Sequence, residues 1–409
     1  MNILLINHYA GSPVHGMEFR PYYLARQWIA AGHEVRILAA SQSHLRTSAP
    51  QLHGRSELEQ DIDGIHYHWV ATPPYRANGI ARAGNMAAFV WHLQRHAKRL
   101  ARTWRPNLVI ASSTYPLDIW PARRIATLAG ATLVYEVHDL WPLTPIELGG
   151  MSARHPFIML LQSAEDYACR HAERVVSILP KAGQHLVARG MAPHKLHVIP
   201  NGINPDDWRE PHAPLDAALA ARLAPLRARG HSIVGYAGHH GLANALDMLL
   251  AVASRMRHLP ISFVLAGAGP CKLELQAHAL ALGLTQVLFV DPVPKAQIPA
   301  LLGQFDLAYL GWRRHSLYRF GIAPNKLSDY MMAALPVVHA VEAGNDPVAD
   351  TGCGLSVAPD DPDAVAAAIT SLLDCAPARR RELGQRGRQH VLDHLSYPVL
   401  GQRFLAACT

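Results

Sequence analysis

The chain has 409 residues, of which 50% are hydrophobic and 17% are charged, and its formal net charge is +7 with histidine neutral. This composition excludes a disordered or fibrous protein, and the length exceeds one ordinary core but suits two. No apolar run approaches the roughly 20 residues of a membrane-spanning helix. The moderate basic excess fits acidic ligands or an anionic membrane face, and predicts no nucleic-acid partner.

The N-terminal stretch Met1–Asn7 is apolar over the length of a strand and then runs into polar residues. It lacks the basic start and the small-residue cleavage site of a signal peptide, which predicts a cytoplasmic protein. The five cysteines include no pair at metal-ligand or redox spacing, which predicts reduced thiols and no zinc site.

A first series of short apolar runs alternates with longer segments of helical period. The predicted strands are Ile3–Ile6, Glu34–Ala39, Ile65–Val70, Leu108–Ala111, Thr132–Val137, Arg174–Ser177 and Leu196–Ile199. The helical segments between them include Phe19–Ala31, Ala87–Thr103 and Ile158–Ala172. Apolar strands separated by helices predict a parallel sheet that is covered on both faces.

A run rich in turn residues, Asn201 to Pro214, is predicted to link this domain (1–200) to a second one (201–385). A helix is predicted at Leu215–Arg229. The strands of the second series are Ser232–Ala237, Ile261–Ala266, Gln286–Phe289, Leu307–Leu310, Val337–Ala340 and Gly354–Val357. The predicted fold class is therefore α/β, with two Rossmann-like, doubly wound parallel-sheet domains. Ligands of such sheets bind beyond the carboxyl ends of the strands, so we expect a cleft there.

The loop after the first strand carries Gly11 and Gly16 before a helix. Met17 and Glu18 replace the Lys-Ser/Thr pair of a phosphate-binding P-loop, and the Gly-x-Gly-x-x-Gly pattern of dinucleotide-binding proteins is absent. Two readings remain: a site where free backbone N–H groups at the helix start receive an anion, and a tight strand–helix turn.

Three further loops follow predicted strands. His138 ends the strand at Thr132–Val137, and its imidazole could hydrogen-bond a sugar hydroxyl or a leaving phosphate. Gly235-Tyr-Ala-Gly-His-His-Gly-Leu, which includes Gly238 and His239, is a candidate phosphate cradle. Leu265-Ala-Gly-Ala-Gly-Pro, which includes Gly267, Gly269 and Pro270, lets a ligand approach the backbone. Either glycine-rich loop could also be a plain turn.

The strongest local signal is the segment Phe320 to Val338, in which Pro324 suits the start of a helix. Lys326 would then lie in the first turn, where the helix dipole disfavours a cation. A bound diphosphate would remove this conflict, and Asp329 lies on the same helix face, three residues on. The alternative is a surface ion pair between Lys326 and Asp329. We favour the diphosphate.

Other charged patterns are assigned no function. Asp61 and Asp63 resemble a metal-binding pair but fall in a predicted surface turn, and His66 and His68 share one strand face with no third ligand nearby. The helix at Ala87–Thr103 has an apolar face and a basic one, which indicates a core-facing helix; membrane docking is the alternative reading.

Together these loops resemble glycosyltransferase family 4, the retaining sugar-nucleotide transferases with the GT-B fold. The resemblance spans nearly the whole chain and is carried by Gly16-Met-Glu, Gly32-His-Glu-Val, His138, Ile199-Pro-Asn-Gly-Ile-Asn, Leu265-Ala-Gly-Ala-Gly-Pro and Asp329-Tyr-Met-Met-Ala-Ala-Leu-Pro. The combination of His8-Tyr-Ala-Gly-Ser-Pro, Gly16-Met-Glu-Phe-Arg-Pro and Ala323-Pro-Asn-Lys-Leu-Ser-Asp is similar to the bacterial O-antigen and capsule subgroup, which includes N-acetylfucosamine transferases.

The resemblance implies a role for each matching position. Gly16 would lie under the donor diphosphate, and His138 would contact the donor sugar. Asp329 would hold the ribose hydroxyls as the second acid of the family's Glu-x7-Glu motif. The resemblance also implies nucleotide-pocket positions at Gly267, Gly269, Pro270 and Asn325, a base-bordering loop at Asp291–Pro294, and a C-terminal helix (386–409) that packs back on the first domain.

The chain departs from the family pattern at two functional positions. Gly321 stands where the first acid of Glu-x7-Glu is expected, and His239-His240 replace the usual basic pair. We therefore expect Lys326 to supply the positive charge for the diphosphate.

These features predict a retaining glycosyltransferase that needs no metal or other cofactor. It would move a sugar, expected to be an N-acetylated amino or deoxy sugar, from a UDP-sugar to a lipid-linked saccharide, with peripheral contact to the inner leaflet of the membrane. His138 and Lys326 are the groups predicted to act in the reaction. The alternatives are a UDP-sugar epimerase of similar fold and a non-catalytic protein that binds nucleotide sugars.

Overall fold

The computed structural model describes residues 1–76 and 79–408. The chain divides into two compact units: Met1–Asn201 together with the segment from Tyr397 onward, and Gly202–Ser396. Each predicted strand is present within one residue of its expected bounds.

The first unit contains an eight-stranded sheet in the order β3-β4-β2-β1-β5-β6-β7-β8. Its strands are β1 Asn2–Ile6, β2 Glu34–Ala40, β3 Glu57–Ile62, β4 Ile65–Val70, β5 Leu108–Ala111, β6 Thr132–Val137, β7 Arg174–Ser177 and β8 Leu196–Val198. All neighbouring strands pair in parallel except β3, which runs antiparallel to β4 at the edge. The antiparallel strand β3 was not predicted, because its sequence Glu57-Leu-Glu-Gln-Asp-Ile is largely polar.

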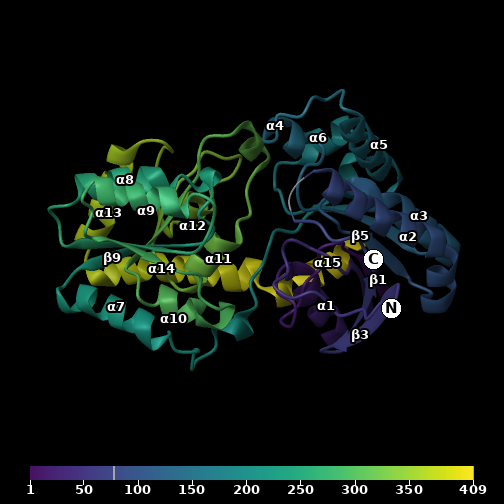
Figure 1. The fold of residues 1–409 in the computed structure, drawn as a ribbon, viewed down its shortest axis with the longest axis horizontal. Helices are drawn as coiled ribbons and strands as arrows, with labels where there is room; N and C mark the ends of the chain where they lie inside the picture. The colour runs from purple at the N-terminus through teal and green to yellow at the C-terminus, as the bar shows by residue number, and fades with distance from the viewer. Residues whose placement is uncertain (77–78, 409) are drawn as a thin grey trace. The chain divides into compact units, whose positions relative to one another are not determined.

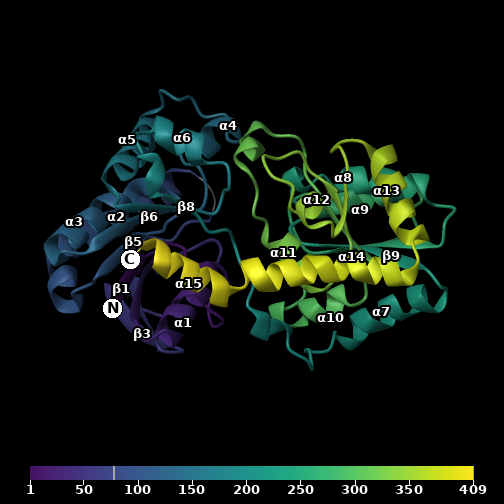
Figure 2. The same cartoon turned by 180° about the vertical axis from the view of Figure 1, so that it is seen from behind.

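Helices cover both faces of this sheet (Figures 1 and 2). They are α1 Arg20–Ala30, α2 Ile80–Trp104, α3 Ile119–Ala129, α4 Leu143–Glu147, α5 Pro156–His171, α6 Gly183–Ala188 and α15 Tyr397–Cys408. On one face, Trp28 of α1 and Phe404 of α15 share a core with Ile3 and Leu5 of β1. The face opposite is covered by α2, α3 and α5, which pack side by side.

The second unit contains six parallel strands in the order β11-β10-β9-β12-β13-β14. They are β9 Ser232–Ala237, β10 Ile261–Ala266, β11 Val287–Val290, β12 Leu307–Gly311, β13 Val337–Ala340 and β14 Gly354–Ser356. The helices are α7 Ala217–Ala228, α8 Leu246–Arg255, α9 Lys272–Ala281, α10 Ile298–Leu302, α11 Asn325–Met332, α12 Pro347–Thr351, α13 Pro362–Asp374 and α14 Pro377–His390. Two cores result: α8, α9 and α13 cover one face, and α7, α10 and α11 cover the other (Figure 1).

The C-terminal segment differs from its predicted bounds. Residues 386–396 belong to the second unit, because Leu383 of α14 and Val391 after it are buried in that unit's cores. The chain joins the first unit only at Tyr397, whose ring stacks on that of Tyr23 at a centroid distance of 4.9 Å. Trp28 Nε1 donates to the Gly401 carbonyl at 3.2 Å, which fixes α15 against α1.

Strand order reverses between β1 and β5 in the first unit, and between β9 and β12 in the second. Loops that leave the strand ends at such reversals can diverge and admit a ligand. The predicted site residues lie on these loops or on the strands and helix beside them.

Candidate functional site

Two loops of the second unit meet beyond the ends of β9 and β10. Gly238 N–H donates to the Ala266 carbonyl at 2.9 Å, and His240 N–H donates to the Ala268 carbonyl at 2.8 Å. A Cβ atom on Gly267 would lie 1.8 Å from the Gly238 carbonyl oxygen, and one on Gly269 would lie 2.4 Å from that of His240. Both glycines are therefore required so that the two loops can pack backbone to backbone.

A hollow adjoins this pair of loops. It has a volume of about 420 Å³ and is lined by Ala237, Gly238, Ile298, Leu302, Pro324, Asn325, Lys326, Asp329 and Tyr330. A second hollow of about 270 Å³ shares Ala237, Gly238 and Ile298 with the first and extends to His239, Ala266, Gly267, Ala268, Pro292, Val293 and Leu301. We call the two together the β9 pocket.

The β9 pocket collects most of the predicted donor-binding positions. Gly238, His239 and Gly267 line it from the strand ends, and Asn325, Lys326 and Asp329 line it from α11. Pro292 and Val293 come from the loop that was expected to border a base. Gly269 and Pro270 are not among the lining residues, and Gly269 packs against the backbone of His240.

Lys326 is the cation of the β9 pocket. Its Nζ donates to Asn244 Oδ1 at 2.5 Å and to the Tyr236 hydroxyl at 3.0 Å, and it lies 4.9 Å from the Tyr236 ring centroid. Asn244 Nδ2 and the Tyr236 hydroxyl both donate to the His239 carbonyl. Two neutral side chains, those of Asn244 and Tyr236, thus connect Lys326 to the β9 loop by hydrogen bonds. Burial lowers the pKa of Lys326 to about 8.

Asp329 lies one turn after Lys326 on α11. Within the part of the chain that the structure describes, no ion pair joins Asp329 to Lys326, and no carboxylate pairs with Lys326. The alternative of a surface i,i+3 pair is therefore not what the structure shows. Burial raises the pKa of Asp329 to about 7, with a smaller opposing effect from Lys295.

His240, next to the pocket, is fully buried. Among the described residues, none is a hydrogen-bond partner of either ring nitrogen. Burial, with a smaller contribution from the Lys272 charge, lowers its pKa to about 4, so the ring is neutral at pH 7. His240 therefore supplies no positive charge at pH 7 at one of the two positions where the family usually has a basic pair.

A second polar cluster lies at the strand ends of the first unit. The Ser112 hydroxyl, at the end of β5, donates to Glu136 Oε2 at 2.6 Å and lies 2.9 Å from His138 Nε2. Glu136 Oε1 lies 2.9 Å from the Arg20 guanidinium at the start of α1. We call these four residues the His138 network.

The charges of the His138 network are matched. Burial alone would raise the pKa of Glu136, but Arg20, His138 and Ser112 lower it to about 2. Arg20 also donates to the carbonyls of Ile199 and Pro200 at 2.9 and 2.6 Å. Because the Ser112 proton goes to Glu136, Ser112 can only accept from His138, so His138 Nε2 carries a hydrogen.

Gly16 lies in a closed turn of the first unit. Its N–H donates to the Ser12 carbonyl at 2.8 Å, and its φ of +90° is one that glycine adopts readily. A Cβ atom here would lie 2.7 Å from Thr47 Oγ1. The Gly16 N–H, which the sequence analysis considered as a possible anion ligand, thus forms a hydrogen bond within the turn.

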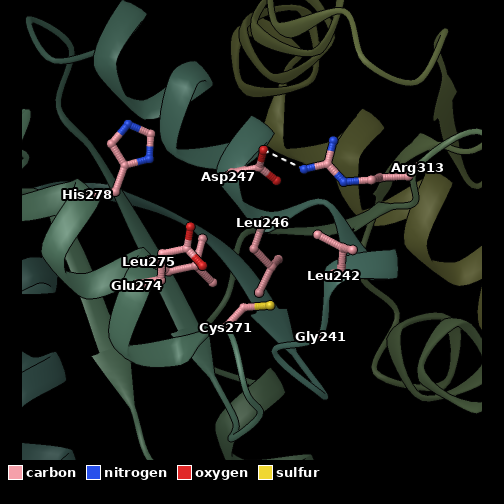
Figure 3. A pocket seen from close by; sticks show the side chains of 9 residues that line it. All are labelled: Gly241, Leu242, Leu246, Asp247, Cys271, Glu274, Leu275, His278 and Arg313. Atoms are coloured by element: carbon pink, nitrogen blue, oxygen red, sulfur yellow. Dashed lines mark hydrogen bonds and ion pairs between the residues drawn. The ribbon is translucent and has the colours of Figure 1, made fainter.

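A smaller hollow of about 150 Å³ lies beyond the β9 loop, among α8, α9 and the end of β12 (Figure 3). Two of its charged residues form an ion pair, in which Arg313 donates to Asp247 Oδ2 at 2.7 Å. Cys271, Glu274 and His278 line it from α9 and the residue before it. Sequence reasoning placed no site here.

The comparisons with known proteins decide the family. Residues 15–202 match the family described as "Glycosyl transferase 4-like domain", and residues 231–375 match "Glycosyl transferases group 1". The chain belongs to glycosyltransferase family 4. A relative in Escherichia coli strain K12, whose name describes it as a colanic acid biosynthesis glycosyl transferase, WcaI, is 22% identical over 364 residues and covers 85% of this chain and 86% of its own.

Solved structures share the fold of this family 4 glycosyltransferase. Sucrose-phosphate synthase of Thermosynechococcus elongatus has a TM-score of 0.71 at 17% identity and covers 99% of this chain and 97% of its own. Anabaena HepE in complex with UDP and glucose has a TM-score of 0.68 at 15% identity, covering 99% and 98%. WaaG, a glycosyltransferase involved in lipopolysaccharide biosynthesis, has a TM-score of 0.67 at 15% identity and covers both chains fully. The predicted GT-B fold is confirmed.

No helix among the described residues is both long and apolar enough to cross a membrane. Sequence reasoning missed the partners of two predicted site residues: Ser112 and Glu136 beside His138, and Tyr236 and Asn244 beside Lys326. A charged residue inside an apolar strand, Glu136, was the one local signal that a buried partner such as Arg20 must exist.

Proposed function

We propose that this glycosyltransferase moves a sugar from a UDP-sugar to a lipid-linked saccharide during surface polysaccharide synthesis. The observation that carries the proposal is Lys326, a half-buried cation in the β9 pocket whose partners are the neutral groups of Asn244 and Tyr236. Such a cation is costly unless an anion joins it, and a diphosphate would do so. The names of the relatives support the substrate classes: colanic acid for WcaI, lipopolysaccharide for WaaG, and UDP with glucose for HepE.

In the proposed reaction, the bond between the anomeric carbon and the diphosphate breaks while the acceptor hydroxyl attacks from the same face. The departing diphosphate takes the acceptor's proton, and the configuration of the sugar is retained. Lys326 would stabilise the negative charge that grows on the diphosphate, and the N–H groups of the β9 loop would position it. Because Lys326 can supply this charge, we propose that the transfer needs no metal ion. For His138 we propose a hydrogen bond to the sugar during transfer.

The proposed identity of the sugar rests on the missing first acid of the Glu-x7-Glu motif, at the position of Gly321. Gly321 carries no side chain that could bind sugar hydroxyls, and its loop is held instead by Asn345, which accepts from Ile322 N–H at 2.7 Å and donates to the Ile322 carbonyl at 3.1 Å. A donor with fewer hydroxyls to satisfy, an N-acetylated amino or deoxy sugar, suits such a site. Comparable turnover of UDP-glucose and UDP-N-acetylhexosamines would contradict this assignment.

Contact with the inner leaflet is proposed from α2. This helix exposes Trp91, with the Arg95 guanidinium 5.7 Å from its ring centroid, beside exposed Lys98 and Arg102. An aromatic ring among cations suits the interface of an anionic membrane. Co-sedimentation with phosphatidylglycerol vesicles that is unchanged by Trp91→Ala would count against this face.

Calorimetric titration with UDP tests the donor assignment, with GDP for base selectivity and EDTA in a parallel run. Lys326→Met keeps the length of the side chain and removes its charge, so UDP affinity should fall about 10- to 100-fold, the range for a lost hydrogen bond to a charged group. Lys98→Met removes an exposed lysine of the first unit and should leave UDP affinity unchanged.

Each outcome bears on a different part of the proposal. Unchanged UDP affinity in Lys326→Met would remove Lys326 from the site. Failure of the native protein to bind UDP would overturn the donor assignment and favour a scaffold role. Conversion of a UDP-sugar without any acceptor would favour an epimerase. Loss of UDP binding in EDTA would contradict metal-free transfer.

A further inference from the structure

A cluster of histidines with one carboxylate lies in the first unit, at the sheet edge that the sequence did not predict. Glu57 is the first residue of the antiparallel edge strand β3, and His68 lies on the neighbouring strand β4. His92 and His96 are one turn apart on α2, with ring centroids 4.3 Å apart. Three secondary-structure elements thus bring four potential metal ligands together.

The geometry of three of these residues suits one small cation. Glu57, His92 and His96 each offer a ligand atom within 4.8 Å of the others. Glu57 Oε1 lies 2.8 Å from His92 Nε2. His96 Nδ1 lies 3.1 Å from the His92 carbonyl, and a hydrogen bond there leaves His96 Nε2 as an acceptor. A backbone bond of this kind commonly orients a metal-binding histidine.

His68 is the independent sign that the cluster is not complete. It is 2% exposed, its Nε2 lies 3.2 Å from Glu57 Oε2, and its Nδ1 lies 3.4 Å from Glu59 Oε1. Neither ring nitrogen makes a hydrogen bond of acceptable geometry with any residue that the structure describes. An unsatisfied buried imidazole costs free energy that a rearranged Glu57 could recover.

We propose that Glu57, His92 and His96 bind one zinc ion, with His68 orienting Glu57 through the carboxylate oxygen that the metal does not use. Two imidazoles and a carboxylate are a preferred zinc set, and water can complete the tetrahedron. The ion fastens the edge strand β3 to α2. An unpaired edge strand is a liability in a sheet, and a metal that fixes it to a helix protects it.

Arg99 competes with the metal for the same oxygen. Its guanidinium contacts Glu57 Oε1, and its side chain is 49% exposed, so it can swing into solvent when a cation arrives. Removal of Arg99 should therefore tighten zinc binding. This is a gain of function that a damaged fold would not produce.

The test is a zinc titration of the full chain after removal of metals with EDTA and dialysis, in competition with a chromogenic chelator. The native protein should bind one equivalent of zinc saturably, and its thermal midpoint should rise with zinc concentration. His96→Ala and Glu57→Gln should each weaken binding about tenfold or more. Arg99→Ala should strengthen it about two- to fivefold, the worth of an exposed ion pair.

The chain offers a matched control. His390 and His394 have the same spacing as His92 and His96, and their ring centroids are 4.9 Å apart, but they lie in the second unit. The double variant His390→Ala, His394→Ala should bind zinc as the native protein does. The proposal is overturned if no saturable equivalent binds, if binding survives both His96→Ala and Glu57→Gln, or if it is lost in the control.

Discussion

The His138 network and the β9 pocket lie at equivalent strand ends of their two units, but their charges are arranged in opposite ways. In the network, the Glu136 carboxylate meets Arg20, Ser112 and His138, so each charge has a partner. In the pocket, the hydrogen-bond partners of Lys326 within the described part of the chain are the neutral oxygens of Asn244 and Tyr236. The first arrangement is complete in the protein alone, whereas the second gains most when an anion binds.

The largest effect is expected on stability, when a charge of the His138 network is removed. Arg20→Met leaves Glu136 buried without its cation, which should destabilise the first unit by about 3–5 kcal/mol. Calorimetric unfolding measures this change. The same substitution at Arg26, also on α1, is the control: Arg26 and Asp63 form an exposed pair at 3.6 Å, expected to contribute at most about 1 kcal/mol.

The comparison would fail if Lys326→Met destabilised the protein as much as Arg20→Met does. We expect instead little change or a small gain in stability, because the substitution removes a half-buried charge that has no counter-ion among the described residues.

The next effect concerns the histidine that closes the network. His138→Ala should lower kcat about 100-fold, the scale for one lost hydrogen bond to a transition state, without changing UDP affinity. Steady-state kinetics with a UDP-sugar and lipid acceptor, beside calorimetry, give the two quantities. His194→Ala, an exposed histidine of the same unit, should alter neither. Equal losses in kcat and UDP affinity would show that His138 acts in donor binding or folding.

The smallest effect is the pH dependence of UDP binding. Lys326 has a pKa of about 8, so it is charged below that pH, and UDP affinity should fall up to about tenfold per pH unit above it. Asp329 ionises near pH 7, and the repulsion between its carboxylate and the diphosphate also lowers UDP affinity as pH rises. In Asp329→Asn, only the fall in UDP affinity near pH 8 should remain. In Lys326→Met, the fall in UDP affinity near pH 8 should vanish. If it persists, a titratable group other than Lys326 causes it.

Local patterns predicted the fold well because parallel strands buried on both faces are continuous apolar runs, as in Ile261–Ala266. The edge strand β3 escaped because three of its six residues are acidic. The pair Asp63-Gly64, both with positive φ, forms its hairpin turn, and Asp-Gly is a recognised signal for such a turn. That signal could have found β3, and with it the position of Glu57.

In the candidate site too, local patterns predicted some residues and missed others. Lys326 and Asp329 were predicted because they lie on one helix, and helical periodicity can be recognised in the sequence. Arg20 and Glu136 are separated by 116 residues, and no periodicity links them. Asn244 and Tyr236 escaped for a related reason: their roles follow from how the β9 loop folds back, which depends on backbone packing against Gly267.

The return of the chain at Tyr397 sets the order in which the two units can be completed during synthesis. Every residue of the second unit leaves the ribosome before α15 does, so that unit can fold while one face of the first sheet still lacks its last helix. Trp28, which ends fully buried beside Phe404, has no α15 to cover it during this interval. The nascent first unit is therefore the part of this protein that chaperones would have to protect.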